Sequence, residues 1–469
     1  MPAADSPAIL CARYLKANNY NETLEAFLGE AGLPSDAGSV NNPGDLTIEK
    51  VLEEKKVFDL SLNFERFNVA EIGRRWTSPE PEHPWAVESL PSSSNLLHVS
   101  VENAPEGRQI LFASTADRRL NLIELRGTFA LLDSLCSVHD SPILSCTVLP
   151  LAGMVTLTTS MSGQVVLYDH QAKRALDERR DHTKYVVKAA QSQHGASTWV
   201  ATAGWDAKIF VYQVRQDVNG TVRLEMASSL SLATNPETIT FIPHPESKRP
   251  ILLVTRRDST CLHYYHCDHD DASISPTMNM RFLGSQNLAP HSNAWVSFSP
   301  ASIALCPTDP QLVAVATSAV PHMRLITVRM LIPKILSSAA ENIATREPRT
   351  QNARARQQLV VEDQEDAAIQ LNVNTFAPQT PYSTPQVSWR PDGSGVWVTA
   401  EDGVVRGLDA TTGKICATLK GGHEPGSKIR SLWAGMVDVD GEEEEWVISG
   451  GFDKRLIVWK SGEESKVSP

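Results

Sequence analysis

One pattern recurs between residues 85 and 460 of this 469-residue chain. A run rich in β-branched and apolar residues is followed by a pair of small or turn residues and then by Asp-x2-Φ-x-Φ-Φ, where Φ is apolar or aromatic. The clear copies are ILFASTADRRLNLIEL, WVATAGWDAKIFVY and WVISGGFDKRLIVW. Small residues before the Asp suit a tight hairpin turn, and the alternation after it suits a half-buried strand. Each copy therefore predicts a β-hairpin.

Four weaker copies bring the number of repeats to seven. VTLTTSMSGQVVLY has Ser162 in place of the Asp, VWVTAEDGVVRGLD and LLVTRRDSTCLHYY match in part, and LVAVATSAVPHMRLITV is degenerate. Repeats of about 40–50 residues that each supply several short strands are typical of a β-propeller. The predicted fold is therefore mainly β, a seven-bladed propeller over residues 85–460, preceded by a small all-α module.

Histidines stand upstream of three repeats: His139 in VHDSP, His182 in DHTKY and His423 in GGHEPG. With the turn Asp, these residues resemble WD repeats over about residues 85–460. In that family the His, the turn Asp and the aromatic end of the third strand form a hydrogen-bond network inside a blade. The resemblance implies that the following residues are structural: His182, Asp206, Tyr212, His423, Asp453, Trp459, Asp117 and Asp402. A catalytic His–Asp pair would need an exposed nucleophile beside it, and since the sequence places none, we expect no catalytic residue.

The two ends of the repeat region predict how the ring closes. After Trp459 the chain has only the polar KSGEESKVSP, so the last blade lacks an outer strand. The run WAVESL precedes the first blade. Because an open ring would expose an unpaired strand edge, we expect residues 85–90 to complete the blade of residues 440–460.

The N-terminal residues 7–30 have apolar side chains at helical spacing, interrupted at Asn18 and Asn19. Asn21 is the expected N-cap of the second helix, and Gly32-Leu33-Pro34 is expected to end it. Two helices this short cannot bury enough apolar surface alone. They therefore need a partner.

The spacing Leu10-x3-Tyr14-Leu15-x3-Asn19-Tyr20-x2-Thr23-x3-Phe27-x2-Glu30 resembles the LisH motif. That family forms homodimers in which two copies pack their helices together. Asn19 stands where the family commonly has Gly, and Asn also accepts the left-handed conformation. The alternative is an ordinary helical hairpin that docks on the rest of the chain. The dimerisation residues that the resemblance implies are Leu10, Tyr14, Leu15, Tyr20, Leu24 and Phe27.

The predicted organisation has five parts. Residues 1–40 form the LisH-like hairpin, and residues 41–72 an amphipathic helical extension capped by Asp45 or Thr47. Residues 73–84 read as a Pro-rich linker, 85–460 as the propeller and 461–469 as a polar tail. An insertion at about 331–366 interrupts the repeats. Its start, PKILSSAAENI, is expected to be a short helix, the rest to about 366 a flexible loop, and IQLNVNTF a strand. The loop is either a solvated connection or a partner-docking segment.

The overall composition excludes several classes of protein. A net charge of −12 does not favour nucleic acid or anionic lipid as a partner. The sequence has neither a signal peptide nor an apolar run long enough for a membrane span, so we expect an intracellular, cytoplasmic or nuclear protein. Seven scattered cysteines do not form a disulfide framework. The segment CLHYYHCDHDD departs from zinc-ligand spacing, so neither a metal nor another cofactor is expected.

These patterns together predict a non-enzymatic, dimeric scaffold. The chain would bind itself through the N-terminal helices and other proteins on a face of the propeller. Family analogy leaves three alternatives: a regulator of microtubule-motor or nuclear-positioning machinery, a substrate receptor of a cullin-type ubiquitin ligase, and a transcriptional co-repressor subunit. The first usually has a long coiled coil, and the second often ends a blade in Trp-Asp-x-Arg; this chain has neither.

Overall fold

The computed structural model describes residues 6–40, 46–52, 76, 79–104, 107–195, 197–217, 221–269, 278–291, 298–335, 351–439 and 441–461. The chain divides into two compact units, Met1–Arg74 and Arg75–Pro469. We call them the helical unit and the propeller. Among the described residues, none of the helices has the length and apolar character needed to cross a membrane.

The helical unit begins with the predicted hairpin of helices α1 (Pro7–Ala17) and α2 (Asn21–Glu30). Between them Asn19 has a φ of 60°, the left-handed conformation that Asn accepts more readily than most residues. The expected N-cap is wrong by one position, because Tyr20 is the cap and Asn21 is already helical. The helix ends as expected, where the Leu33 N–H donates to the Leu28 carbonyl at 2.9 Å.

The chain after the hairpin folds back on α1. The Arg13 guanidinium donates to the Leu46 carbonyl at 2.7 Å, and the Lys16 ammonium donates to the Ser39 hydroxyl at 2.7 Å. Thr47 caps the next helix, since its hydroxyl accepts from the Lys50 N–H at 3.3 Å. Asp45, the other predicted cap, and residues 53–72 of the predicted extension lie outside the described residues.

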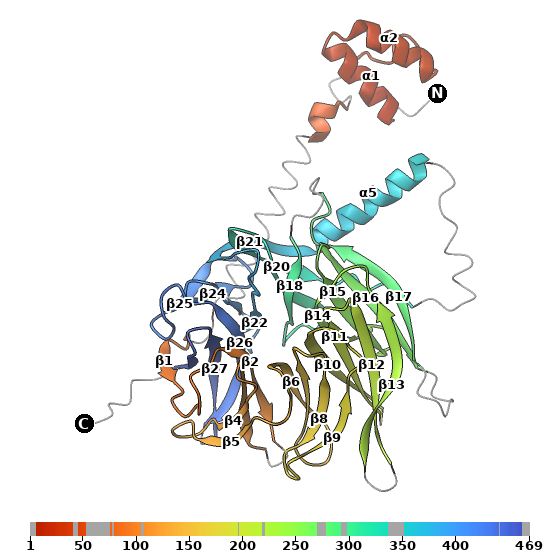
Figure 1. Cartoon of the computed structure of the whole chain (residues 1–469). Coiled ribbons are helices and arrows are strands. Elements are labelled where there is room, and N and C mark those ends of the chain that lie inside the picture. The colour runs from red at the N-terminus through yellow and green to blue at the C-terminus, as the bar shows by residue number, and fades with distance from the viewer. Residues whose placement is uncertain are drawn as a thin grey trace. The chain divides into compact units, whose positions relative to one another are not determined.

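The propeller consists, within the described residues, of seven four-stranded antiparallel sheets, which confirms the predicted fold (Figure 1). Each repeat predicted from the sequence lies in its own sheet. Blade 1 contains β2 (Leu96–Asn103), β3 (Gln109–Thr115), β4 (Leu120–Glu124) and β5 (Leu131–Leu135). Blade 2 contains β6 (Ile143–Leu149), β7 (Val155–Ser160), β8 (Val165–Asp169) and β9 (Arg174–Arg179). Blade 3 contains β10 (Val186–His194), β11 (Ser197–Gly204), β12 (Lys208–Gln216) and β13 (Val222–Ser231).

The remaining blades follow in chain order. Blade 4 contains β14 (Pro236–Pro243), β15 (Pro250–Arg256), β16 (Cys261–His269) and β17 (Met278–Asn287). Blade 5 contains β18 (Pro300–Leu305), β19 (Leu312–Thr317), β20 (His322–Arg329) and β21 (Ile369–Pro378). Blade 6 contains β22 (Val387–Trp389), β23 (Gly395–Val398), β24 (Val405–Asp409) and β25 (Ile415–Leu419). Blade 7 contains β26 (Ile429–Val439), β27 (Glu442–Gly451), β28 (Leu456–Lys460) and β1 (His83–Ala86).

The core lies between the blades. The first strands of neighbouring blades contact one another all the way round, from β2 through β6, β10, β14, β18, β22 and β26 back to β2. An apolar cluster fills the space between each pair of adjacent sheets. Trp446 belongs to the cluster between blades 7 and 1, and Trp397 and Trp459 belong to the one between blades 6 and 7. Both faces of every blade are thereby covered.

The predicted closure is confirmed, with slightly different bounds. Strand β1 pairs with β28 in antiparallel register, His83 opposite Lys460 and Ala86 opposite Ile457. The Val87 N–H extends the ladder by donating to the Leu456 carbonyl at 2.9 Å. The N-terminal edge of the propeller therefore supplies the outer strand of its last blade.

The predicted linker of residues 73–84 is wrong at Trp76 and at His83 and Pro84, which are already part of the propeller. The Trp76 ring lies 5.2 Å from that of Trp397, edge to face, and the Arg390 guanidinium lies over it at 4.3 Å. Gly407 leaves room for this indole, since a Cβ there would come within 2.3 Å of it. Arg390 in turn pairs with the buried Glu445 of β27. Trp76 thus anchors the chain between blades 6 and 7.

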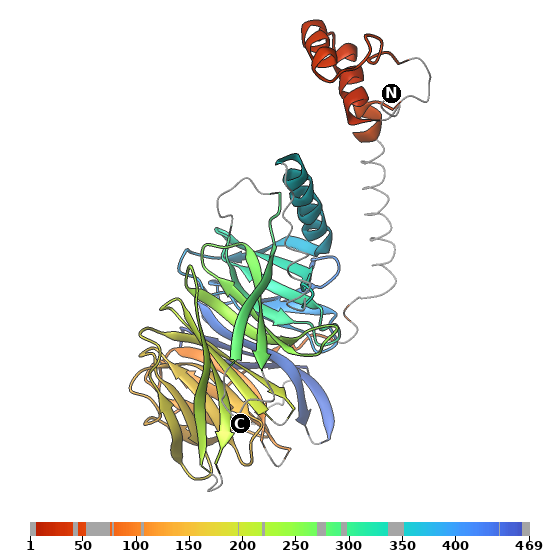
Figure 2. The same ribbon diagram turned by 90° about the vertical axis from the view of Figure 1, so that its right-hand side faces the viewer.

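The insertion in blade 5 also differs from the prediction. Residues 351–366, expected to be a flexible loop, belong to helix α5 (Gln351–Ala368), which leads into β21 as predicted for IQLNVNTF. Residues 333–335 of the expected short helix are not helical, and the rest of that segment lies outside the described residues. Figures 1 and 2 show α5 standing out from the sheets.

The pairing of β1 with β28 predicts that proline is more destabilising at residue 87 than at residue 86. Val87→Pro removes the N–H that bonds to Leu456, so we expect the free energy of unfolding to fall by about 2 kcal/mol or more. Ala86→Pro is the matched control, because alternate N–H groups of this edge strand point away from β28. Urea unfolding followed by tryptophan fluorescence measures both. Equal losses in the two variants would contradict the closure.

Candidate functional site

One end of the propeller carries the turns between second and third strands together with the loops that connect successive blades. We call this end the turn face. In blade 3 the Trp205 N–H donates to the Tyr185 carbonyl at 2.8 Å, and in blade 7 the Phe452 N–H donates to the Lys428 carbonyl at 2.9 Å. The same bond between turn and loop recurs in other blades, from Ala116 to Asn95, Met161 to Pro142, Arg257 to Asn235 and Ser318 to Ser299. The turn face is therefore held by a repeated backbone contact.

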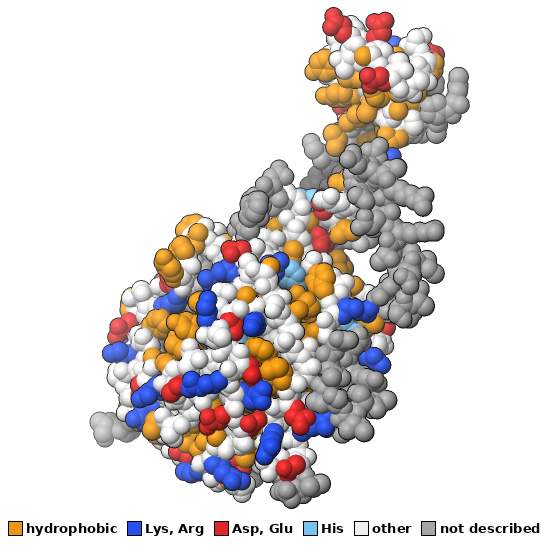
Figure 3. Space-filling model, turned by 45° about the vertical axis from the view of Figure 1, so that its right-hand side comes forward, with side chains coloured by type: hydrophobic (Ala, Val, Ile, Leu, Met, Phe, Trp, Pro, Cys, Tyr) orange, Lys and Arg blue, Asp and Glu red, His pale blue; other side chains and the backbone are white. Residues whose placement is uncertain are grey.

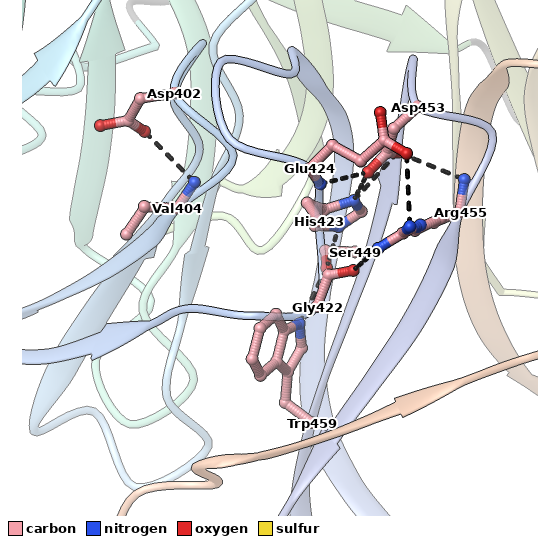
Figure 4. A network of polar contacts seen from close by, with 9 residues as sticks. All are labelled: Asp402, Val404, Gly422, His423, Glu424, Ser449, Asp453, Arg455 and Trp459. Atoms are coloured by element: carbon pink, nitrogen blue, oxygen red, sulfur yellow. Dashed lines mark hydrogen bonds and ion pairs between the residues drawn. The ribbon is translucent and has the colours of Figure 1, made fainter.

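Blade 7 has a continuous polar network beneath this face (Figure 4). The Trp459 indole N–H donates to the Ser449 hydroxyl at 2.8 Å, and that hydroxyl lies 2.8 Å from His423 Nε2. His423 Nδ1 lies 3.0 Å from the Asp453 carboxylate, which also accepts from the Glu424 N–H at 2.9 Å. With Nδ1 protonated and Nε2 accepting, every group in the chain from indole to carboxylate is satisfied.

Asp453 is the acidic group of this network, and its surroundings favour the charged carboxylate. Burial acts to raise the pKa of its carboxyl group, but the hydrogen bonds from His423 and from the Glu424 N–H outweigh burial and lower it. The side chains of His423 and Asp453 are 0% and 1% exposed. The pair is consequently sealed inside the blade.

Blade 3 holds a variant of the same network. His182 Nδ1 lies 3.0 Å from Asp206 and its Nε2 lies 2.9 Å from the Thr202 hydroxyl. Burial lowers the pKa of His182 despite the carboxylate beside it. The Tyr212 hydroxyl contacts the Thr202 hydroxyl, but unlike the Trp459 indole it donates elsewhere, to Asp181 at 3.0 Å. Tyr212, the aromatic residue that the resemblance placed in the network, thus connects Thr202 to the loop before His182.

The structure places the remaining turn acids outside any histidine network. The Asp117 carboxylate accepts from the hydroxyls of Ser92 and Thr115, and Asp402 pairs with Arg406. Blade 2, whose turn has Ser162, instead sets His139 Nε2 at 2.8 Å from the Thr158 hydroxyl. Burial lowers the pKa of His139 to about 4.

The turn face also displays side chains that the repeat pattern did not single out. Tyr185 stacks on Trp205 with ring centroids 5.7 Å apart, and the Arg257 guanidinium lies over Trp205 at 4.9 Å. Arg257 donates to Glu237 at 2.7 Å. We call these four residues the aromatic–arginine patch. Tyr185 lies in a loop between blades, and Trp205 and Arg257 lie in turns between second and third strands. The repeat pattern specifies no residue type at these positions.

The first strands of the ring also carry charged residues that interact with one another. Lys188 in β10 and Arg430 in β26 interact electrostatically, although their strands belong to different blades. Burial, reinforced by Arg430, lowers the pKa of Lys188. Burial likewise raises the pKa of Glu102 to about 7. Glu237 of the patch interacts with Arg430, which links the turn face to the centre of the ring.

The cysteine–histidine segment of blade 4 belongs to a strand. Cys261 and Cys267 both lie in β16, and Cys267 is buried in the core between blades 3 and 4. His263 Nε2 accepts from the Arg256 guanidinium at 3.0 Å. In the part of the chain that the structure describes, no three His, Cys, Asp or Glu side chains are grouped so that they could hold a metal ion.

The motif residues of the helical unit have a different character from those of the blades. In α2 none of the side chains is fully buried; Tyr20 is 52% exposed and Tyr14 of α1 is 37% exposed. Leu10, Leu15, Leu24 and Phe27 are half-buried. Figure 3 shows apolar side chains on the surface of this unit. The described helices alone therefore leave much of their apolar surface uncovered.

Comparison with protein families gives two matches that coincide with the two units. A profile described as UCP007778, beta-propeller domain, matches residues 68–460, and one described as UCP007778, LisH domain, matches residues 8–35. The chain belongs to the UCP007778 family. The helical unit thus contains a LisH domain, as its spacing indicated. A search of curated proteins found no significant match.

The blade 7 network yields a direct test. Ser449→Ala leaves both the Trp459 indole N–H and His423 Nε2 without a partner in a buried site, so we expect a loss of about 2–4 kcal/mol in the free energy of unfolding. Ser449→Thr, the matched control, keeps the hydroxyl, as Thr202 does in blade 3. Chemical denaturation measures both. A Thr variant as unstable as the Ala variant would show that side-chain volume, not the hydroxyl, matters here.

Proposed function

We propose that this chain is a non-enzymatic, dimeric scaffold that binds other proteins with the turn face of a WD-repeat-like propeller. The observation that carries the proposal is the aromatic–arginine patch on the turn face of a chain that also has a LisH domain. Tyr, Trp and Arg are the residues most enriched at the energetic centres of protein interfaces. The proposed ligand is therefore a protein surface.

The self-association rests on the exposed motif residues. Tyr14 and Tyr20 are large, partly apolar side chains on helices too short to fold stably alone. Val51 and Leu52, which follow in the same unit, are 40% and 54% exposed. Packing against a second copy would cover this surface, which small soluble domains seldom leave open to water.

Two further features support a binding surface over an active site. The His–Asp pairs of blades 3 and 7 are sealed in the sheets, with both histidine side chains 0% exposed, and so cannot reach a substrate. By contrast, Tyr185 and Phe452 on the turn face are 43% and 39% exposed. These two His–Asp pairs are therefore inaccessible, whereas the two aromatic side chains are displayed on the surface.

The mechanism that follows is avidity. Two propellers joined through their LisH domains would meet a partner with two binding sites at a high effective concentration. Each contact could then be weak, while the joint affinity exceeds either one by about 10²–10⁴-fold. The scaffold would select partners by the spacing of their sites as well as by their surfaces.

For the dimer, Tyr20→Asp is expected to give a single-chain mass by multi-angle light scattering, where the unmodified chain has the mass of two. A carboxylate buried in an apolar helical seam costs several kcal/mol. Glu22→Lys alters a charge on the opposite side of α2 and should leave the mass unchanged. A Tyr20→Asp protein with the mass of two chains would contradict dimerisation through this motif.

For the binding face, Tyr185→Asp and Phe452→Asp should each reduce the amount of partner protein captured in affinity purification. The expected loss of binding free energy is about 2 kcal/mol if the residue lies at the energetic centre of the interface. Met226→Asp is the matched control, since Met226 is 38% exposed on the outer strand of blade 3. Capture lost equally in all three variants would place the binding surface elsewhere.

A further inference from the structure

The contacts by which helix α5 meets the propeller lie near its C-terminal end. The Glu365 carboxylate accepts from the Asn287 N–H of β17 at 2.7 Å. Ala368, 8% exposed, packs in the core between blades 4 and 5. Away from this end the helix extends beyond the sheets in both views of the ribbon (Figures 1 and 2).

The middle of α5 exposes three adjacent apolar side chains. Leu359 is 56% exposed, Val360 is 55% exposed and Val361 is 45% exposed. Val361 shares a helix face with Glu365, four residues later, and so points to the side that meets the propeller. Leu359 and Val360 lie on the other side.

That other side has a symmetrical pattern. Arg356, Leu359, Val360 and Asp363 follow the spacing i, i+3, i+4 and i+7, which places them on one helix face. All four are exposed. Two apolar residues form the centre of the face, with a positive charge at its N-terminal end and a negative charge at its C-terminal end. We call it the outer face of α5.

We propose that the outer face of α5 pairs with the same face of α5 in a second copy of this chain, with the two helices antiparallel. A two-fold axis between Leu359 and Val360 sets Arg356 opposite Asp363 of the partner subunit. The same axis sets Leu359 opposite Val360 of the partner subunit. The face is thereby complementary to itself in charge and in shape, as a two-fold interface requires.

The charge pattern selects the antiparallel arrangement. A parallel pair would place Arg356 against Arg356 of the partner subunit, and Asp363 against its own copy. Like charges at such positions destabilise a helical contact. The antiparallel pair turns both repulsions into attractions.

The pairing rests on the proposed dimer, because two exposed helices of this length bury little surface. Once LisH domains hold two chains together, contact between their α5 helices becomes an intramolecular event at high effective concentration. The second contact would hold the two propellers in one fixed relation, which contact between the LisH domains would not do by itself.

The test uses the full chain with the exposed Cys11, Cys136 and Cys416 replaced by Ser. Leu359→Cys is then treated with a short bis-maleimide cross-linker, and cross-linked dimer is quantified on a denaturing gel. We expect about tenfold more dimer than from the matched control Val361→Cys, whose side chain is on the propeller side of α5. Equal yields would overturn the pairing.

Charge exchange tests the orientation in the Leu359→Cys background. Arg356→Glu or Asp363→Arg alone brings like charges together and should reduce cross-linking about tenfold, whereas the double variant should restore it. Cross-linking that ignores these charges overturns the antiparallel pairing. A mass of two chains without cross-linking overturns the α5 contact alone and leaves the proposed dimer intact; a single-chain mass at every concentration overturns both.

Discussion

Burial of two apolar faces on every blade is the constraint on which the rest of this structure depends. A four-stranded sheet with apolar residues on both faces is stable only between two neighbours, so the chain must form a ring with no first or last blade. The pairing of β1 with β28 satisfies that requirement. It lets the Trp446 cluster form between the blade that ends the chain and the blade that begins it.

The polar networks are a consequence of the same burial. A histidine, a hydroxyl and a carboxylate between apolar sheets are tolerated only when each donor and acceptor is paired. Blade 7 meets this condition with a chain from Trp459 to Asp453, and blade 3 meets it with a different aromatic partner. The residues of the network differ between the two blades because the fold requires that buried hydrogen-bonding groups are paired, and more than one set of residues meets this requirement.

The regular parts of the fold could be predicted from the sequence because they repeat. Alternation and turn residues recur seven times, the left-handed Asn19 follows from a local rule, and the closing strand follows from the need to leave no strand edge unpaired. The exceptions depend on single contacts. Trp76 is one aromatic residue in a Pro-rich stretch, and nothing in its neighbourhood indicates the pocket that Gly395 and Gly407 leave for it. The electrostatic interaction of Lys188 with Arg430 depends on the ring, which brings segments distant in the sequence near one another.

Helix α5 was missed for a different reason. Its mixed charges suit a solvated loop as well as a helix, and its apolar residues are adjacent, so they show no clear amphipathic period. The candidate binding residues Trp205 and Phe452 were not predicted because the repeat pattern specifies the turn Asp and not the residue before it. The turn Asp holds the blade, and the residue before it, Trp205 in blade 3 or Phe452 in blade 7, bonds to the neighbouring loop through its backbone N–H. The same turn thus stabilises the sheet through its backbone and its Asp while it displays the preceding side chain, so a change of that side chain need not disturb the ring.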